Sequence, residues 1–176
     1  MGGPHPKLPS GSRRKPNKKE GENLMAGMTK ESIQLKNVKI AWNMSEETTA
    51  FTASLYINGK KAADVKNEGT GGDNHPRFTD RELEKEFCEF CTTLPYPGES
   101  FNMTYDSFIG VLLDEWIEND AWKKACRKGI VYTLTGHKDG EYMIWKVPYS
   151  PDMAKRVREQ YSETGNLKEI INERFI

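Results

Sequence analysis

The chain has 176 residues, 36% of them hydrophobic, and its 26 basic and 26 acidic residues leave no net charge. The charge is uneven, because residues 1–24 carry a net charge of +4 and the remainder carries −4. The acidic remainder argues against a dedicated duplex-DNA-binding protein. No apolar run approaches the length of a membrane span or of a signal-peptide core. The number of cysteines is three, and an odd number favours a reduced compartment over a disulfide scaffold. A cytoplasmic protein is therefore expected.

Residues 1–30 form a leader that is rich in Pro, Gly, Ser, Lys and Arg and has few aliphatic side chains. Such a segment cannot bury enough apolar surface to offset the entropy of ordering. The sequence therefore predicts a disordered basic leader over residues 1–30 and one folded domain over residues 31–176.

The folded part opens with alternating apolar residues, which predict a strand over residues 33–42 with a bulge at Asn37. A second alternating run, residues 51–57, leads into Asn58-Gly59, the strongest short signal for a β-hairpin. A three-residue loop places Ala63 opposite Ala53 on the apolar face, whereas a two-residue loop places a charged residue there, so burial favours the three-residue loop.

Helices are predicted next. Residues 79–82 form a capping box for a helix that starts at Asp80, and residues 92–103, with their prolines, form a loop. A second helix over residues 105–118 is apolar around so much of its circumference that it is expected to be the central buried helix. Asp120 is expected to cap a separate short helix that ends at Gly129.

The last third predicts a hairpin of strands over residues 130–135 and 141–147, and then a helix from Ser150-Pro151 to about Tyr161. The final residues fit either a short helix or an edge strand. Strands, helices, strands and a helix in this order predict an α+β fold, with an antiparallel sheet of about five strands and helices packed mainly on one face.

The glycine-rich loop over residues 69–77 is the candidate site. Unpaired N–H groups in such loops and at helix N-termini favour anions, and a histidine and an arginine add a general base and a bidentate donor. The predicted ligand-binding residues are Gly71, Gly72, Asp73, Asn74, His75 and Arg77. The alternative is a mobile loop that only turns the chain, because its spacing matches neither a P-loop nor a dinucleotide fingerprint.

Two further patterns have a structural alternative. Cys88 and Cys91 form a C-x-x-C motif, but they lie within a predicted helix without a second pair of ligands, so we interpret them as structural and expect no metal and no cofactor. The basic residues around Trp122 can clamp single-stranded nucleic acid, although such faces are more often solvated with the tryptophan in the core. The residues concerned are Trp122, Lys123, Lys124 and Arg127.

The hairpin over residues 55–65, followed by Asn67-Glu-Gly-Thr-Gly-Gly-Asp-Asn, resembles small uncharacterised proteins encoded by phages and other mobile elements. The resemblance covers the middle third of the chain and implies a phage or host cytoplasm, where such proteins bind host machinery or sequester nucleotides. Because no complete catalytic set is present, the first hypothesis is a non-enzymatic accessory protein that binds a host protein or an anionic ligand. The alternative is a small phosphoryl or nucleotidyl hydrolase built on residues 69–77.

Overall fold

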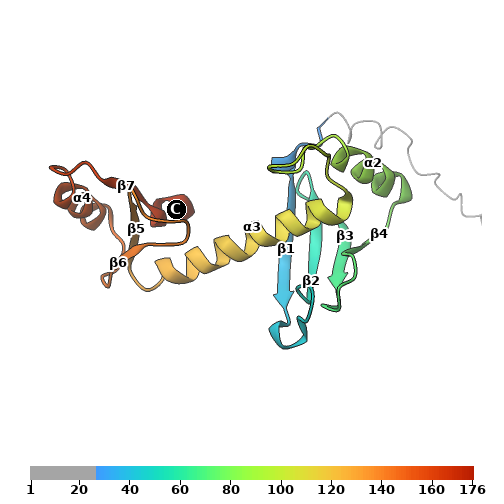
Figure 1. Cartoon of the computed structure of the whole chain (residues 1–176), viewed down its shortest axis with the longest axis horizontal. Coiled ribbons are helices and arrows are strands. Elements are labelled where there is room, and N and C mark those ends of the chain that lie inside the picture. The colour runs from blue at the N-terminus through green and yellow to red at the C-terminus, as the bar shows by residue number, and fades with distance from the viewer. Residues whose placement is uncertain (1–26) are drawn as a thin grey trace, which may run out of the picture. The chain divides into compact units, whose positions relative to one another are not determined.

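A computed structural model describes residues 27–176, which divide into two compact units (Figure 1). The first unit ends at Tyr105 and the second comprises Asp106–Ile176. Most of the predicted leader lies outside the described residues. Its end does not, because Met28 is buried and Thr29 caps a 3-10 helix, η1 (Lys30–Ser32). The fold therefore begins before residue 31.

The first unit is built on a four-stranded antiparallel sheet in the order β1-β2-β3-β4, followed by one helix. The elements are β1 (Ile33–Ile40), β2 (Phe51–Ile57), β3 (Lys60–Asn67), β4 (His75–Phe78) and α2 (Arg81–Cys91). One face of the sheet is apolar, since alternate residues of β2 and β3 are buried. Phe87 of α2 packs there against Phe78, with ring centroids 5.5 Å apart.

The β2–β3 hairpin corrects the predicted loop. Its turn has two residues, Asn58 and Gly59, with positive φ values of 50° and 75°, and β3 then bulges so that Ala53 lies opposite Val65. The predicted loop of three residues and the pairing of Ala53 with Ala63 are therefore wrong. The apolar face is nevertheless as predicted, because a bulge within the strand restores the alternation that a longer turn was expected to provide.

The predicted bulge in β1 is confirmed. Asn37 has a positive φ of 54°, and the register with β2 shifts between Lys36 and Lys39. The strand ends at Ile40, however, and Trp42 lies in a 3-10 helix, η2 (Trp42–Met44), rather than in the strand as expected.

Helix α2 begins one residue later than predicted. Asp80 is the N-cap, and its carboxylate accepts hydrogen bonds from the N–H groups of Glu82 and Leu83 at 2.9 and 3.4 Å. A carboxylate at this position satisfies two N–H donors of the first turn, and its negative charge interacts favourably with the positive end of the helix dipole.

The second unit starts with a single helix, α3 (Tyr105–Cys126), where two helices were predicted. Phe108, Ile109, Leu112 and Leu113 are buried, as the pattern indicated. Asp120 does not start a new helix but lies within α3, where its side chain pairs with Lys124 one turn later at 2.6 Å. No glycine or proline interrupts residues 114–121, so nothing in this stretch breaks the helix.

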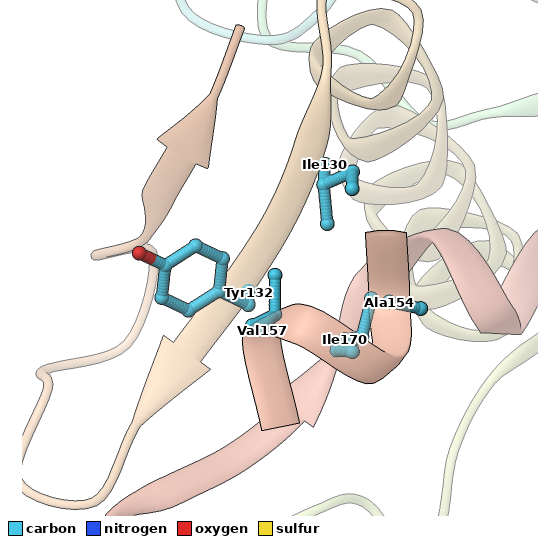
Figure 2. Packing of buried hydrophobic residues seen from close by; sticks show 5 residues of the cluster. All are labelled: Ile130, Tyr132, Ala154, Val157 and Ile170. Atoms are coloured by element: carbon cyan, nitrogen blue, oxygen red, sulfur yellow. The ribbon is translucent and has the colours of Figure 1, made fainter. Parts of the chain in front are cut away.

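A three-stranded antiparallel sheet in the order β6-β5-β7 follows α3. The elements are β5 (Ile130–Leu134), β6 (Met143–Trp145), α4 (Pro151–Gln160), β7 (Leu167–Ile170) and a 3-10 helix, η3 (Ile171–Phe175). Figure 2 shows Ile130 and Tyr132 of β5 with Ala154 and Val157 of α4 and Ile170 of β7 in one buried cluster. On the opposite face, Val131 packs with Ala125 of α3 and Ile171.

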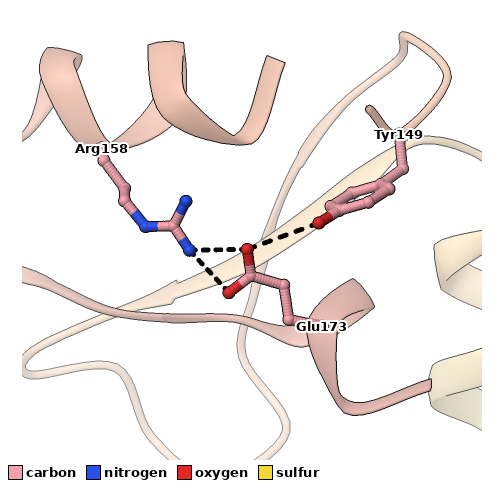
Figure 3. A network of polar contacts seen from close by, with 3 residues as sticks. All are labelled: Tyr149, Arg158 and Glu173. Atoms are coloured by element: carbon pink, nitrogen blue, oxygen red, sulfur yellow. Dashed lines mark hydrogen bonds and ion pairs between the residues drawn. The ribbon is translucent and has the colours of Figure 1, made fainter. Parts of the chain in front are cut away.

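The C-terminal segment is a strand followed by a 3-10 helix, so both alternatives left open for it occur. Its buried Asn172 accepts a hydrogen bond from the N–H of Val131 at 2.7 Å and donates to the carbonyl of Gly129 at 3.0 Å. Figure 3 shows that η3 is also tied to α4, because Arg158 donates to both carboxylate oxygens of Glu173, at 2.5 and 2.7 Å.

The α+β class is thus confirmed, while a single sheet of about five strands is wrong. The described residues form two antiparallel sheets, of four and three strands, and the smaller sheet has helical residues packed on both of its faces. No helix within residues 27–176 has the length and apolar character needed to cross a membrane.

Candidate functional site

The glycine loop lies against the β1–β2 connection, at the end of the sheet where β1 and β3 finish (Figure 1). The carbonyl oxygen of Gly69 accepts hydrogen bonds from three successive N–H groups, those of Glu46, Glu47 and Thr48, at 2.9, 3.1 and 3.3 Å. One loop carbonyl therefore holds three successive residues of the neighbouring connection.

The buried side chain of Asn67 organises the same loop from inside. Its amide oxygen accepts from the N–H of Gly69 at 2.8 Å and from the Thr48 hydroxyl at 3.0 Å. Its amide nitrogen donates to the Gly72 carbonyl at 3.0 Å and to the Asn74 side chain at 3.2 Å. These bonds give the loop a fixed conformation, which neither the anion-site hypothesis nor the mobile-loop alternative had described.

Glycine is favoured at two loop positions by a positive φ, and at Gly69 also by close approach to a backbone carbonyl. Gly69 and Gly71 both have φ of 88°. A Cβ atom would lie 2.3 Å from the carbonyl oxygen of Met44 at Gly69 and 2.2 Å from a carboxylate oxygen of Glu47 at Gly71. No neighbouring atom lies within 4 Å of a Cβ built at Gly72. The glycines thus bring two connections together.

The structure divides the predicted ligand-binding residues into two groups. Gly71, Gly72 and Asp73 lie in the loop, next to Asn74, whose side chain is buried against Asn67. His75 and Arg77 are exposed on β4, which separates the loop from helix α2 by four residues, roughly 13 Å of extended chain. The glycines and the α2 N-terminus, which Asp80 caps, therefore do not converge on one point.

His75 and Arg77 instead belong to the open, polar face of the four-stranded sheet. The strand register places two rows of residues across this face: Lys36, Ser54, Asp64 and Arg77 in one row, and Lys39, Thr52, Lys66 and His75 in the other. The bulge at Asn37 matters here, because it lets Lys36 and Lys39, three residues apart, occupy the same face. We call these two rows the basic face.

Few of the positive charges of the basic face are neutralised within the protein. Asp64 forms an ion pair with Lys61 at 2.6 Å, and the hydrogen bond from Lys61 lowers the pKa of that carboxyl group. Lys66 pairs with Glu68 at 2.6 Å, which lowers the pKa of Glu68, but both side chains are exposed. An exposed pair of this kind contributes little and exchanges readily for another partner.

Comparison of the chain with protein-family models, with curated proteins and with solved structures gave no match.

A hollow of about 460 Å³ adjoins the basic face at the end of the sheet. Lys39, Thr52 and Lys66 contribute polar groups to its lining, while Met44 and Phe51 contribute apolar surface. Two large apolar side chains stand exposed on η2 beside it, with Trp42 at 64% and Met44 at 56% of full exposure. We call Trp42 and Met44 the apolar tip.

The apolar tip is held in place by hydrogen bonds. The Ser45 hydroxyl donates to the carbonyl of Ala41 at 3.1 Å and accepts from the N–H of Ala50 at 3.0 Å, which closes the connection at its base. Together with the three bonds to Gly69, these contacts fix the backbone that carries the tip. Its exposure is therefore built into the fold and does not result from a loosely held loop.

The C-x-x-C cysteines lie on α2, with Cys91 fully buried and Cys88 partly so. Burial raises the pKa of Cys88, and it raises the pKa of Cys91 to about 12, so Cys91 carries no thiolate at neutral pH. Among residues 27–176, no group of three or more His, Cys, Asp or Glu side chains has an arrangement that can hold a metal ion.

The basic stretch at the end of α3 has its tryptophan turned inward. Trp122 packs beside the cluster of Ala125, Val131 and Ile171, and its indole N–H donates to Glu118 at 3.1 Å. Lys124 is paired with Asp120. The aromatic ring and the lysines therefore do not form one stacking surface, which is the arrangement that binding of single-stranded nucleic acid requires.

Sequence reasoning missed the basic face and the apolar tip. The signal for the basic face was present, because lysines alternate with buried residues in β1 and β3, but the sequence analysis considered only the apolar residues of these strands. The tip was missed because Trp42 continues the alternation of β1 and was assigned to the apolar side of that strand.

Proposed function

We propose that the chain is a non-enzymatic binding protein whose basic face and apolar tip together hold an acidic segment of a partner protein. The observation that carries this proposal is the exposure of Trp42 and Met44 on a turn fixed by hydrogen bonds, next to a hollow lined by Lys39 and by Lys66, whose ion pair with Glu68 is exposed. Large apolar side chains held in water favour a surface that is covered in a complex.

The chemistry of the partner follows from the charges around the tip. Lys39 and Lys66 line the hollow, and Lys36, His75 and Arg77 extend the same face. Carboxylates of a partner complement these groups, and an apolar side chain fits the hollow against Met44 and Phe51. A host protein is the partner that the resemblance to phage-encoded proteins implies.

The test is capture of the partner by matched variants. Lys39→Glu/Lys66→Glu reverses two charges of the basic face, and Lys85→Glu/Lys155→Glu makes the same change in charge at two exposed helix positions away from it. We expect the first variant to lose about tenfold or more in affinity and the second to bind like wild type. Trp42→Ala is expected to weaken binding about 30-fold, which is typical of a central aromatic anchor.

Two further measurements complete the test: the salt dependence of partner binding and the oligomeric state of the chain. Binding is expected to weaken between low salt and 0.5 M salt, since exposed charges are screened. Equal retention of the captured protein by wild type and both test variants would refute the proposal. Concentration-dependent dimerisation that Trp42→Ala abolishes would assign the surface to a second copy of the chain instead.

Hydrolysis of a phosphoryl or nucleotidyl group is the second candidate. One observation favours it: His75, Arg77 and Glu84 line a common hollow of about 400 Å³ beside β4. A base, a cation and an acid in one hollow suit general acid–base chemistry. Turnover of a nucleotide that His75→Ala and Arg77→Ala both abolish would support this function over binding alone.

A further inference from the structure

A second hollow, of about 590 Å³, lies within the unit formed by residues 106–176. It opens between the second half of α3 and the face of the small sheet that α4 does not cover. Further along β5 from Val131, Thr133 lies on the same face, and it lines the hollow. No residue of this hollow belongs to the basic face or the apolar tip.

Thr133 is the unusual residue of the hollow. Its side chain is only 9% exposed, and its hydroxyl oxygen is buried without a hydrogen-bond partner, the one such side-chain atom found among the described residues. An unpaired buried hydroxyl is destabilising, and buried polar groups almost always have a partner. A hydrogen bond from a molecule seated in the hollow would remove this deficit.

The walls of the hollow are aromatic and oriented. The rings of Trp122 and Tyr142 meet edge to face, with centroids 5.4 Å apart, and the bond from the Trp122 indole to Glu118 fixes the tryptophan ring. His137 accepts a hydrogen bond from the N–H of Leu134 at its Nδ1 atom, at 3.3 Å, so the neutral ring carries its proton on Nε2 as a further donor.

The charged groups around the hollow have both signs. Three are basic and four are acidic: Lys138, Lys168 and Arg174, and Glu118, Asp139, Glu141 and Glu169. Arg174 is already paired with both oxygens of Glu169. Of the remaining groups, three carboxylates (Glu118, Asp139 and Glu141) and two ammonium groups (Lys138 and Lys168) form no ion pair within residues 27–176. A multiply charged phosphate would therefore meet a net negative charge, whereas an uncharged polar molecule meets no repulsion.

We propose that this hollow binds a small, planar, uncharged nitrogen heterocycle of the nucleobase or nucleoside class. The flat ring packs against the aromatic wall, where stacking is favourable for any base. A polar atom on the edge of the ring or on its sugar pairs with the Thr133 hydroxyl, which can donate or accept. This site does not depend on the partner-binding function proposed above.

The test uses adenosine, guanosine, cytidine and uridine as probes, with saturation-transfer NMR on the full chain. At least one of them is expected to receive saturation from the protein and to bind with a measurable Kd. Thr133→Val, which keeps the shape and removes the hydroxyl, is expected to lose about tenfold or more in affinity and to melt at or above the wild-type temperature. Thr135→Val is the matched control, since Thr135 is exposed beyond the end of the same strand, and it is expected to bind like wild type.

Three results would overturn the proposal. The first is the absence of binding of all four nucleosides to the wild-type chain. The second is unchanged affinity in Thr133→Val, which would place the ligand elsewhere. The third is tighter binding of adenosine 5′-monophosphate than of adenosine, which would contradict the charge argument. A raised melting temperature of Thr133→Val together with lost binding separates ligand contact from a structural role, because a purely structural hydroxyl would lower stability when removed.

Discussion

Replacing Gly69 by alanine tests whether the glycine loop is a rigid support for the apolar tip. Alanine at a φ of 88° costs about 1–2 kcal/mol. Its Cβ would also lie 2.3 Å from the carbonyl oxygen of Met44 and 2.8 Å from the Cβ of Ala50, so the two connections must separate. Each of the three hydrogen bonds to the Gly69 carbonyl contributes about 0.5–1.5 kcal/mol. If the strain is accompanied by the loss of one or two of these bonds at about 1 kcal/mol each, the expected loss is about 2–4 kcal/mol.

Urea denaturation followed by circular dichroism measures this loss, and thermal unfolding of a domain of this size should show a decrease of roughly 10–25 °C in Tm. Gly72→Ala is the control in the same loop, because nothing lies within 4 Å of its added Cβ and its φ is not positive; its stability should change by about 0.5 kcal/mol or less. Equal stability of the two variants would show that the loop does not support the tip, and the argument from rigidity would be lost.

Three further predictions concern single residues. Burial and the hydroxyl contact with Tyr161 raise the pKa of Tyr132 to about 12. The folded state therefore keeps a proton that the unfolded state releases above its ordinary pKa of about 10, so the free energy of unfolding should fall between pH 10 and 12. Tyr132→Phe should remove this part of the decrease in denaturation curves. Asp80→Ala should cost about 1 kcal/mol through loss of the α2 cap, whereas Thr79→Ala should cost less, as urea titrations can compare. If phosphate binds beside β4, it should raise Tm in a thermal-shift assay, and Arg77→Ala should abolish that increase while leaving the unliganded Tm unchanged.

Local patterns predicted most of the individual elements. Alternation and the Asn58-Gly59 turn located β2 and β3, and Ser150-Pro151 located the start of α4. The register of the hairpin was not predicted, because a bulge after a two-residue turn and a longer turn without a bulge bury the same face. Such alternatives differ in backbone geometry and leave the hydrophobic pattern unchanged.

The errors at a larger scale have a similar cause. Asp120 has the residue type of an N-cap, but the same carboxylate also stabilises a continuous helix through Lys124, and only the course of the backbone distinguishes the two. The division into two sheets depends on which strands pair across long stretches of sequence, as β5 does with β7, and periodicity within a strand carries no information about its partner.

The sequence predicted the position of the candidate site but not the bonding within it. The sequence drew attention to residues 69–77, and the loop does hold a special conformation. Its polar atoms, however, bond to Asn67 and Thr48, which are separated from one another by 19 residues. An asparagine or a threonine in a sequence does not indicate that its side chain anchors a loop. The glycines were therefore interpreted as part of a ligand site rather than as the place where two connections meet.

The position of Asn172 has a consequence for the order in which the protein is made. The last turn of α3 and the first residues of β5 rely on this side chain for partners, yet Asn172 follows Val131 by 41 residues and Cys126 by 46. A ribosome therefore synthesises α3 and β5 before it adds the residue to which they are bonded. The hydrogen bonds of the second unit are therefore incomplete until Asn172 has been synthesised, and a nascent chain that stalls before this residue would lack them.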